Sequence, residues 1–169
     1  MLGKKGVSEV IASVLLIALV MVLSAIIWMV VQNLINPNLE QTSSCFGIFD
    51  KVKVGNTYTC YDSSSDELRL SLEVGEVDIN AILISITGES ATKTLRINDT
   101  ASAIDGVTNY SSGTSVQIPG RNSGLTYLID INTIGVGTPS IVKIAPFVGK
   151  ELCSVSDSIT SIPSCSSLT

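Results

Sequence analysis

Residues 10–31 read VIASVLLIALVMVLSAIIWMVV, a run of 22 residues without a charged residue, a proline or a glycine. As an α-helix with a rise of about 1.5 Å per residue, this run is ~33 Å long. That length slightly exceeds the ~30 Å hydrocarbon core of a bilayer. The two polar side chains, Ser13 and Ser24, can each donate a hydrogen bond to a carbonyl of the preceding turn. The stretch therefore predicts one helix that is apolar on every side and long enough to cross a membrane.

The residues around this helix predict its orientation and argue against two other interpretations. Lys4 and Lys5 precede the run, and basic residues stay on the cytoplasmic side, so the carboxyl-terminal part is expected outside. Trp28 lies near the outer end, where an indole ring suits the membrane interface. A helix in a soluble core would need a polar face. A cleaved secretory signal would have a shorter apolar region and a small-residue cleavage site, which Ile26 to Met29 does not provide.

The residues before the helix follow a recognisable order. A basic pair and a glycine, KKG at residues 4–6, come before VSE at residues 7–9 and the apolar run. This order resembles the class III signal of archaeal type IV pilins and archaellins, whose prepilin peptidase cuts after the glycine and leaves the helix on the mature protein. The resemblance implies cleavage between Gly6 and Val7. Bacterial pilins have Phe first and Glu fifth in the mature chain, whereas Glu9 would be third here.

The resemblance also implies an organisation and a function. A leader is expected at residues 1–6, a transmembrane and filament-core helix at 7–36, and an extracellular head at 37–169. The expected partners are other copies of the chain, the prepilin peptidase, the pilus-assembly machinery and, before assembly, the cell membrane. The chain is then expected to be a structural subunit of an archaeal surface filament that serves attachment. The alternative is a single-pass, membrane-anchored extracellular binding domain that does not polymerise.

Glu9 is the only acidic residue before position 40. A carboxylate left unpaired among apolar helices is costly. Cleavage after Gly6 would create an ammonium group at Val7, on the same or a neighbouring subunit, and this group is the expected partner of Glu9 during assembly. The alternative is that Glu9 is a solvated flank of the helix in the cytoplasmic headgroup region.

The sequence pattern changes after the helix. Because Pro37 disfavours helical structure at Asn36, we expect the helix to end at residues 34–36. Beyond it, apolar and polar residues alternate with the period of a half-buried strand. The expected strands are residues 68–74, 81–87, 92–98 and 141–148, with weaker candidates at 115–118 and 127–131. Residues 46–54 and 57–61 are expected to form a hairpin around Gly55 and Asn56.

Seven or eight short strands separated by turn residues predict an antiparallel sandwich. Pro146 indicates that the last strand lies at an edge or ends early. The expected fold class is α+β, with a long hydrophobic helix followed by an all-β head. The resemblance to archaellin and archaeal pilin heads implies an immunoglobulin-like arrangement.

All four cysteines, Cys45, Cys60, Cys153 and Cys165, follow the apolar helix. They allow three pairings, and an outward head meets an oxidising environment in which disulfides persist. We favour Cys45–Cys60 across the expected hairpin and Cys153–Cys165 within the tail. Two glycosylation sequons, which begin at Asn98 and Asn109, lie in turn-like segments and are candidate glycan sites.

Composition argues against several classes of function. The chain of 169 residues has no histidine, which removes the usual partner of a catalytic serine or cysteine. Its net charge is −5, with +1 on residues 1–39 and −6 on the rest, so no nucleic-acid partner is expected. Glu73, Glu76 and Asp78 are close in sequence, but a solvated strand face and turn suit them better than a calcium site. We expect no enzyme activity, cofactor or metal.

Overall fold

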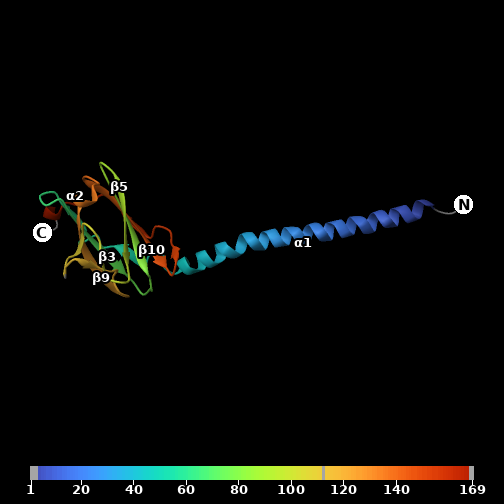
Figure 1. The fold of residues 1–169 in the computed structure, drawn as a ribbon, viewed down its shortest axis with the longest axis horizontal. Helices are drawn as coiled ribbons and strands as arrows, with labels where there is room; N and C mark the ends of the chain where they lie inside the picture. Colours follow the sequence, from blue (N-terminus) through green and yellow to red (C-terminus); the bar gives the residue numbers. More distant parts are fainter. Residues whose placement is uncertain (1–3, 112, 168–169) are drawn as a thin grey trace. The chain divides into compact units, whose positions relative to one another are not determined.

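The computed structural model describes the backbone of residues 4–111 and 113–167, and the side chains at 10–33, 45–111 and 113–166. The chain divides into two units, Met1–Ser43 and Ser44–Thr169. Helix α1, Lys4–Phe46, accounts for the described part of the first unit and enters the second with its last turn (Figure 1).

Helix α1 is longer than the sequence predicted. We expected an end at residues 34–36, and the helix instead continues through Pro37 to Phe46. A proline inside a helix removes one backbone hydrogen bond to the carbonyl four residues earlier. The turns on either side keep their own bonds, so the helix can continue.

The second unit is built from antiparallel sheets, which confirms the α+β class. One sheet has the order β1-β3-β9-β7, and β2 also pairs with β3; its strands are β1 Val52–Val54, β2 Cys60–Asp62, β3 Glu67–Val74, β7 Val107–Asn109 and β9 Ser123–Asp130. The second has the order β11-β10-β4-β5, and β12 also pairs with β10; its strands are β4 Ala81–Gly88, β5 Thr92–Asn98, β10 Pro139–Val148, β11 Glu151–Leu152 and β12 Asp157–Ile159. Smaller elements are β6 Ser102–Ala103 paired with β8 Ser115–Val116, helix α2 Ile131–Ile134 and the 3-10 turn Cys165–Ser167.

Both sheets contribute to one hydrophobic core. Alternate residues of β3 (Leu68, Leu70, Leu72) and β4 (Ile82, Ile84, Ile86) are completely buried in the same cluster, together with Tyr127 and Ile129 of β9. A side chain of this size contributes about 1.5–3 kcal/mol when it is fully buried. The period of two therefore gives each strand an inner and an outer face, as the sequence predicted. The immunoglobulin-like arrangement stays a prediction.

The expected hairpin around Gly55 and Asn56 is wrong. Strands β1 and β2 do not pair with each other, because both pair with β3: β1 opposite residues 72–74 and β2 opposite residues 67–69. Residues 55–59 form a loop between them along the same edge of β3. The loop is held there by the Gly55 amide, which donates to the Ser71 carbonyl at 2.9 Å.

Pro146 lies within β10 and lacks the backbone N–H that other strand residues offer for pairing. Its carbonyl accepts a hydrogen bond from the Cys153 amide at 2.9 Å, on the side of β10 away from β4. Because the N–H and C=O of one strand residue point to the same side, the pairing of β10 with β4 loses nothing. The proline faces the gap between β12, which pairs with residues 142–144, and β11, which pairs with residues 147–148. The expectation that this strand lies at an edge or ends early is wrong, because β10 continues to Val148 and pairs with β4 on one side and with β11 and β12 on the other. The gap gives Pro146 an edge-like position within a central strand.

Candidate functional site

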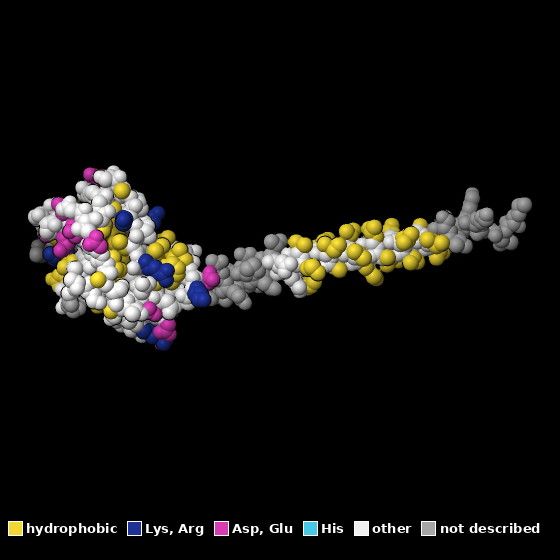
Figure 2. Space-filling view, in the orientation of Figure 1, with side chains coloured by type: hydrophobic (Ala, Val, Ile, Leu, Met, Phe, Trp, Pro, Cys, Tyr) yellow, Lys and Arg dark blue, Asp and Glu magenta, His cyan; other side chains and the backbone are white. Residues whose placement is uncertain are grey.

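The apolar segment of α1 is the first functional feature. One span among the described residues, Val10–Asn33, is long and apolar enough to cross a membrane, and none of it is buried within the protein. Its large apolar side chains are exposed by 37–66% on all sides, and apolar atoms cover the described helix in Figure 2. The Ser13 and Ser24 hydroxyls donate to the carbonyls of Val10 and Met21, each at 2.8 Å. From Val10 to Val31 the helix thus presents an apolar surface on which the only polar side chains, two serines, bond to the helix backbone.

The residues of the expected cleavage and assembly sites lie at the start of α1. Gly6, Val7 and Glu9 are within Lys4–Phe46, so their backbone is helical. Their side chains lie outside the described residues. Cleavage between Gly6 and Val7 and the pairing of Glu9 stay predictions.

The four cysteines form two disulfides, but not the two that we favoured. The bonds are Cys45–Cys153 and Cys60–Cys165, with sequence separations of 108 and 105. The favoured pairs Cys45–Cys60 and Cys153–Cys165 are wrong. The first depended on the hairpin that does not form, and the second on a local closure of the tail.

Main-chain pairing explains the observed partners. The last segment of the chain returns to β2, where the Tyr61 amide donates to the Pro163 carbonyl at 2.9 Å and Tyr61 forms a parallel bridge with Ser164. This contact places Cys165 next to Cys60. Cys45, in the last turn of α1, meets Cys153 directly after β11. Each disulfide therefore joins the beginning of the second unit to its end.

The two candidate glycan sites occupy strand ends. Asn98 is the last residue of β5, and its side-chain carbonyl accepts a hydrogen bond from the Arg96 side chain at 3.0 Å. Asn109 is the last residue of β7, and its side-chain carbonyl accepts from the Ser111 amide at 3.2 Å. Both side chains are half-buried. Their glycosylation stays a prediction.

The three carboxylates considered for calcium do not gather around an empty centre. Glu76 and Asp78 lie 3.6 and 3.7 Å from the two terminal nitrogens of Arg121. Glu73 projects instead from the outer face of β3. The ion-paired cluster consists of Glu76, Asp78 and Arg121. All three side chains are more than half exposed, so they form a solvated surface cluster.

The outer face of β3 and β9 carries a feature that the sequence analysis missed. The core takes Leu68, Leu70 and Leu72, so the intervening residues of β3 face outward. In the sheet register they lie opposite β9 residues as Arg69–Leu128, Ser71–Thr126 and Glu73–Gly124. Two adjoining hollows of about 420 and 370 Å³ lie over this row and share Tyr58 and Thr126 in their linings.

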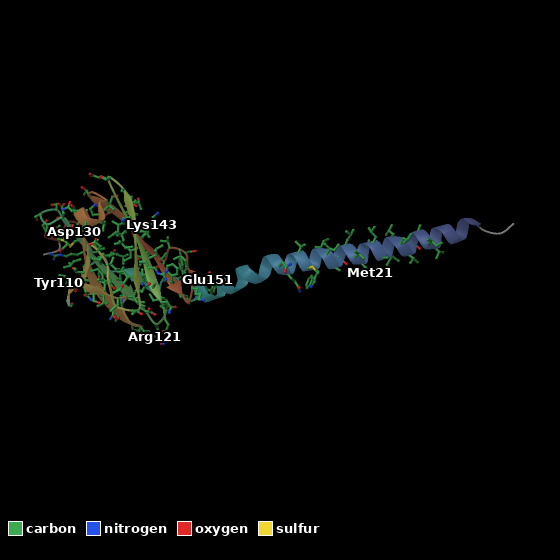
Figure 3. All side chains as sticks on the ribbon, viewed as in Figure 1. Met21, Tyr110, Arg121, Asp130, Lys143 and Glu151 are labelled. Atoms are coloured by element: carbon green, nitrogen blue, oxygen red, sulfur yellow. A yellow bond between two sulfur atoms is a disulfide. The ribbon has the colours of Figure 1, made fainter. Side chains whose placement is uncertain are left out.

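Two exposed tyrosines border these hollows. Tyr58 comes from the loop at residues 55–59 and is 66% exposed; Tyr110 follows β7 and is 60% exposed (Figure 3). The Tyr110 amide donates to the Thr126 carbonyl at 3.0 Å, which fixes this segment against β9. We call the two hollows together the tyrosine groove. The sequence did carry a signal, because both tyrosines sit in otherwise polar turn segments. That they line the same groove depends on the sheet register.

The loop that carries Tyr58 is held closely against the sheet. A Cβ atom on Gly55 would lie 2.9 Å from both Ser71 Oγ and Glu73 Oε1, so a larger residue there would force these two side chains to move. The buried Thr59 hydroxyl donates to the Gly55 carbonyl at 2.8 Å and accepts from the Ser71 amide at 3.1 Å. These bonds position one wall of the groove.

Two tyrosine hydroxyls inside the head have raised pKa values. The Tyr61 hydroxyl donates to Asp66 at 2.7 Å, and this hydrogen bond, with some desolvation, raises the pKa of Tyr61 to about 12. Burial raises the pKa of Tyr127, whose hydroxyl donates to the Gln117 carbonyl at 2.6 Å. Both groups are therefore protonated structural donors at neutral pH.

Asp130 has the opposite shift at the start of α2. Its carboxylate accepts hydrogen bonds from the Thr133 hydroxyl and from the amides of Thr133 and Asn132, and these bonds lower its pKa. It is the N-cap of this short helix. The group has a clear structural role.

Comparison of the chain with protein-family models, with curated proteins and with solved structures finds no match.

Proposed function

We propose that this chain is a structural subunit of a type IV pilus-like surface filament, in which its apolar helices form the core and its β heads the outer surface. The single observation that supports this most is the helix span Val10–Asn33, whose side chains are apolar and exposed all round. Each large apolar side chain left in water forfeits about 1.5–3 kcal/mol. Such a helix needs lipid or other apolar helices around it.

Lipid would surround the helix before assembly, and other copies of the helix would surround it in the filament. A membrane accommodates the helix of the single chain, because the helical backbone is hydrogen-bonded internally and the Ser13 and Ser24 hydroxyls bond to its carbonyls. A bundle of copies would bury the same surface, and small residues such as Ala12, Ala18 and Ala25 would let the helices approach closely. A leader that ends at Gly6 fits this scheme, because its removal would leave the helix on the mature chain.

The disulfide-linked head supports an extracellular location. Cys45–Cys153 and Cys60–Cys165 close the head at both ends, and such bonds persist outside the cytoplasm. A membrane-anchored binding domain that does not polymerise is the second candidate. The tyrosine groove favours binding in either case, so the two candidates differ in the fate of the helix.

The test is to shear the surface of cells that produce the chain, image the released material by electron microscopy and sequence the amino terminus of its protein. We expect filaments whose subunit begins at Val7. Replacement of Gly6 by Leu should leave the precursor in the membrane and abolish the filaments. A mature chain that begins at Met1 or near residue 30, or cells without filaments, would contradict the proposal.

A further inference from the structure

We propose that the tyrosine groove binds a neutral polysaccharide, a ligand class that the filament function does not assign. The inference uses the proposed function in one respect only, namely that the head faces the exterior. The groove lies on the outer face of β3 and β9; Tyr58 lines both of its hollows, and Tyr110 lines the smaller one.

The size and shape of the groove suit a chain-like ligand. Its two hollows, of about 420 and 370 Å³, each fall in the ordinary range of ligand sites, roughly 300–1,000 Å³. Its floor follows β3 from Arg69 to Glu73, which at about 3.3 Å per residue is ~13 Å. An open groove of this length suits several units of a chain molecule better than one compact ligand.

The two tyrosines give the groove exposed aromatic surfaces. Their rings are more than half exposed, and among the described residues no hydrogen bond or ion pair holds either side chain. Both rings therefore offer an exposed surface to a ligand. Tyrosine gives a broad, rigid contact with an apolar face and a polar tip, at a low entropic cost. The faces of pyranose rings, with their rows of C–H groups, match such a surface.

The polar side chains that line the groove can both donate and accept hydrogen bonds. Arg69 supplies donors, Glu73 supplies acceptors, and Asn122, Ser123 and Thr126 supply both. Sugar hydroxyl groups both donate and accept, so they can satisfy this mixture. The Nε atom of Arg69 is buried without a hydrogen-bond partner, and its nearest carboxylate oxygen, on Glu67, is 3.7 Å away. Because this nitrogen has no accessible surface, a ligand would meet only the exposed part of the Arg69 side chain.

The charge of the groove lining favours a neutral ligand. The lining carries one guanidinium, on Arg69, and one carboxylate, on Glu73, so its formal charges cancel. Residues 40–169 as a whole carry −6. An acidic polymer would be repelled by the head and would find no basic row in the groove. A neutral polymer of hexoses is the form of saccharide that the electrostatics favour.

The binding test uses the full chain in detergent micelles, with its disulfides formed and produced in a host that adds no glycans. Calorimetric titration is carried out with the hexasaccharides of amylose, cellulose, β-mannan and β-galactan, and with hexagalacturonate as the anionic counterpart. We expect at least one neutral hexasaccharide to bind with a Kd in the micromolar to millimolar range. Tyr58→Ala and Tyr110→Ala should each weaken binding about tenfold, while Tyr58→Phe and Tyr110→Phe, which keep the ring, should weaken it less.

The matched control is Phe49→Ala, which removes another exposed aromatic ring of the same unit that does not line the groove. Its affinity should equal that of the unchanged chain, and all variants should keep their thermal midpoints because the substituted rings are exposed. Failure of every neutral probe to bind, stronger binding of hexagalacturonate, or equal affinities for the Tyr→Ala variants and the unchanged chain would overturn the proposal. Since single chains in micelles are titrated, these outcomes do not depend on filament formation, which is judged separately by microscopy.

Discussion

Thr59 shows how one buried hydroxyl organises a loop. Its Oγ1 atom donates to the Gly55 carbonyl and accepts from the Ser71 amide, and the residue is completely buried. The bonds replace the ladder pairing that β3 loses between β1 and β2. Together with the bond from the Gly55 amide to the Ser71 carbonyl, they hold the loop that carries Tyr58 against β3.

We predict that Thr59→Val lowers the free energy of unfolding by about 1–3 kcal/mol, because valine keeps the shape but leaves the buried Ser71 amide without a hydrogen-bond acceptor. Urea denaturation followed by near-UV circular dichroism measures this. Thr94→Val, at an exposed position of β5, is the control and should change stability by less than about 0.5 kcal/mol. Equal effects of the two substitutions would show that the hydroxyl bonds of Thr59 contribute nothing.

Tyr61 and Tyr127 predict sensitivity to alkali. Each has a pKa above the ordinary value of a tyrosine, so the folded head holds these protons more tightly than the unfolded chain. Their contribution to stability is complete below about pH 10, the pKa of an unfolded tyrosine, and is lost as the pH rises through the folded pKa, about 12 for Tyr61.

The expected result is a fall in the free energy of unfolding between pH 9 and pH 12, measured by urea titration at each pH. Tyr61→Phe, which has no titrating proton, should make this fall shallower. A slope that Tyr61→Phe leaves unchanged would mean that the hydrogen bond to Asp66 does not couple to folding.

At the scale of elements, α1 combines an apolar surface with one acidic residue, Glu9, near its start. If the helix enters a bundle, this carboxylate needs a partner, and the ammonium group created by cleavage after Gly6 is two residues away. We predict that Glu9→Gln leaves leader processing and the fold of the head unchanged but reduces filament yield. Counting filaments by electron microscopy, with subunit levels equalised by immunoblot, measures the effect. Normal filament numbers in Glu9→Gln cells would support the solvated-flank interpretation instead.

At the scale of the whole molecule, the two disulfides join distant parts of the head. Their sequence separations are 108 and 105 residues, and long loops give the largest restriction of the unfolded chain in the entropic description of disulfides. The short strands β1 and β2 have three residues each; both follow Cys45 in the chain, and Cys60 is the first residue of β2. These strands therefore gain covalent support that their few hydrogen bonds do not provide.

We predict that peptide mapping without reduction recovers Cys45 linked to Cys153 and Cys60 linked to Cys165. Replacing either pair by serine should lower the free energy of unfolding by about 2–5 kcal/mol. Recovery of a Cys45–Cys60 peptide from the oxidised protein would contradict this pairing. Thermal denaturation of the two double variants, with and without reductant, provides the control, since each should lose further stability when its remaining disulfide is reduced.

The sequence by itself determined the features that depend on near neighbours. The apolar run from Val10 fixes a helix, because absence of charge and regular backbone bonding are local properties. Strict alternation likewise located β3, β4 and β5 to within a residue, since the inner and outer faces of a strand follow from its own period of two. The turn residues after α1 also indicated a chain of short strands.

Only the tertiary structure decided how these pieces meet. Gly55 and Asn56 looked like a hairpin turn, but β3 offered pairing sites to both flanking strands and thus separated Cys45 from Cys60. The return of the chain to Tyr61 then selected Cys165 as the partner of Cys60. The tyrosine groove depends on the same register, because Tyr58 and Tyr110 border one hollow only when β7, β9 and β3 lie side by side. Such pairings join residues far apart in the chain, and no local pattern specifies them.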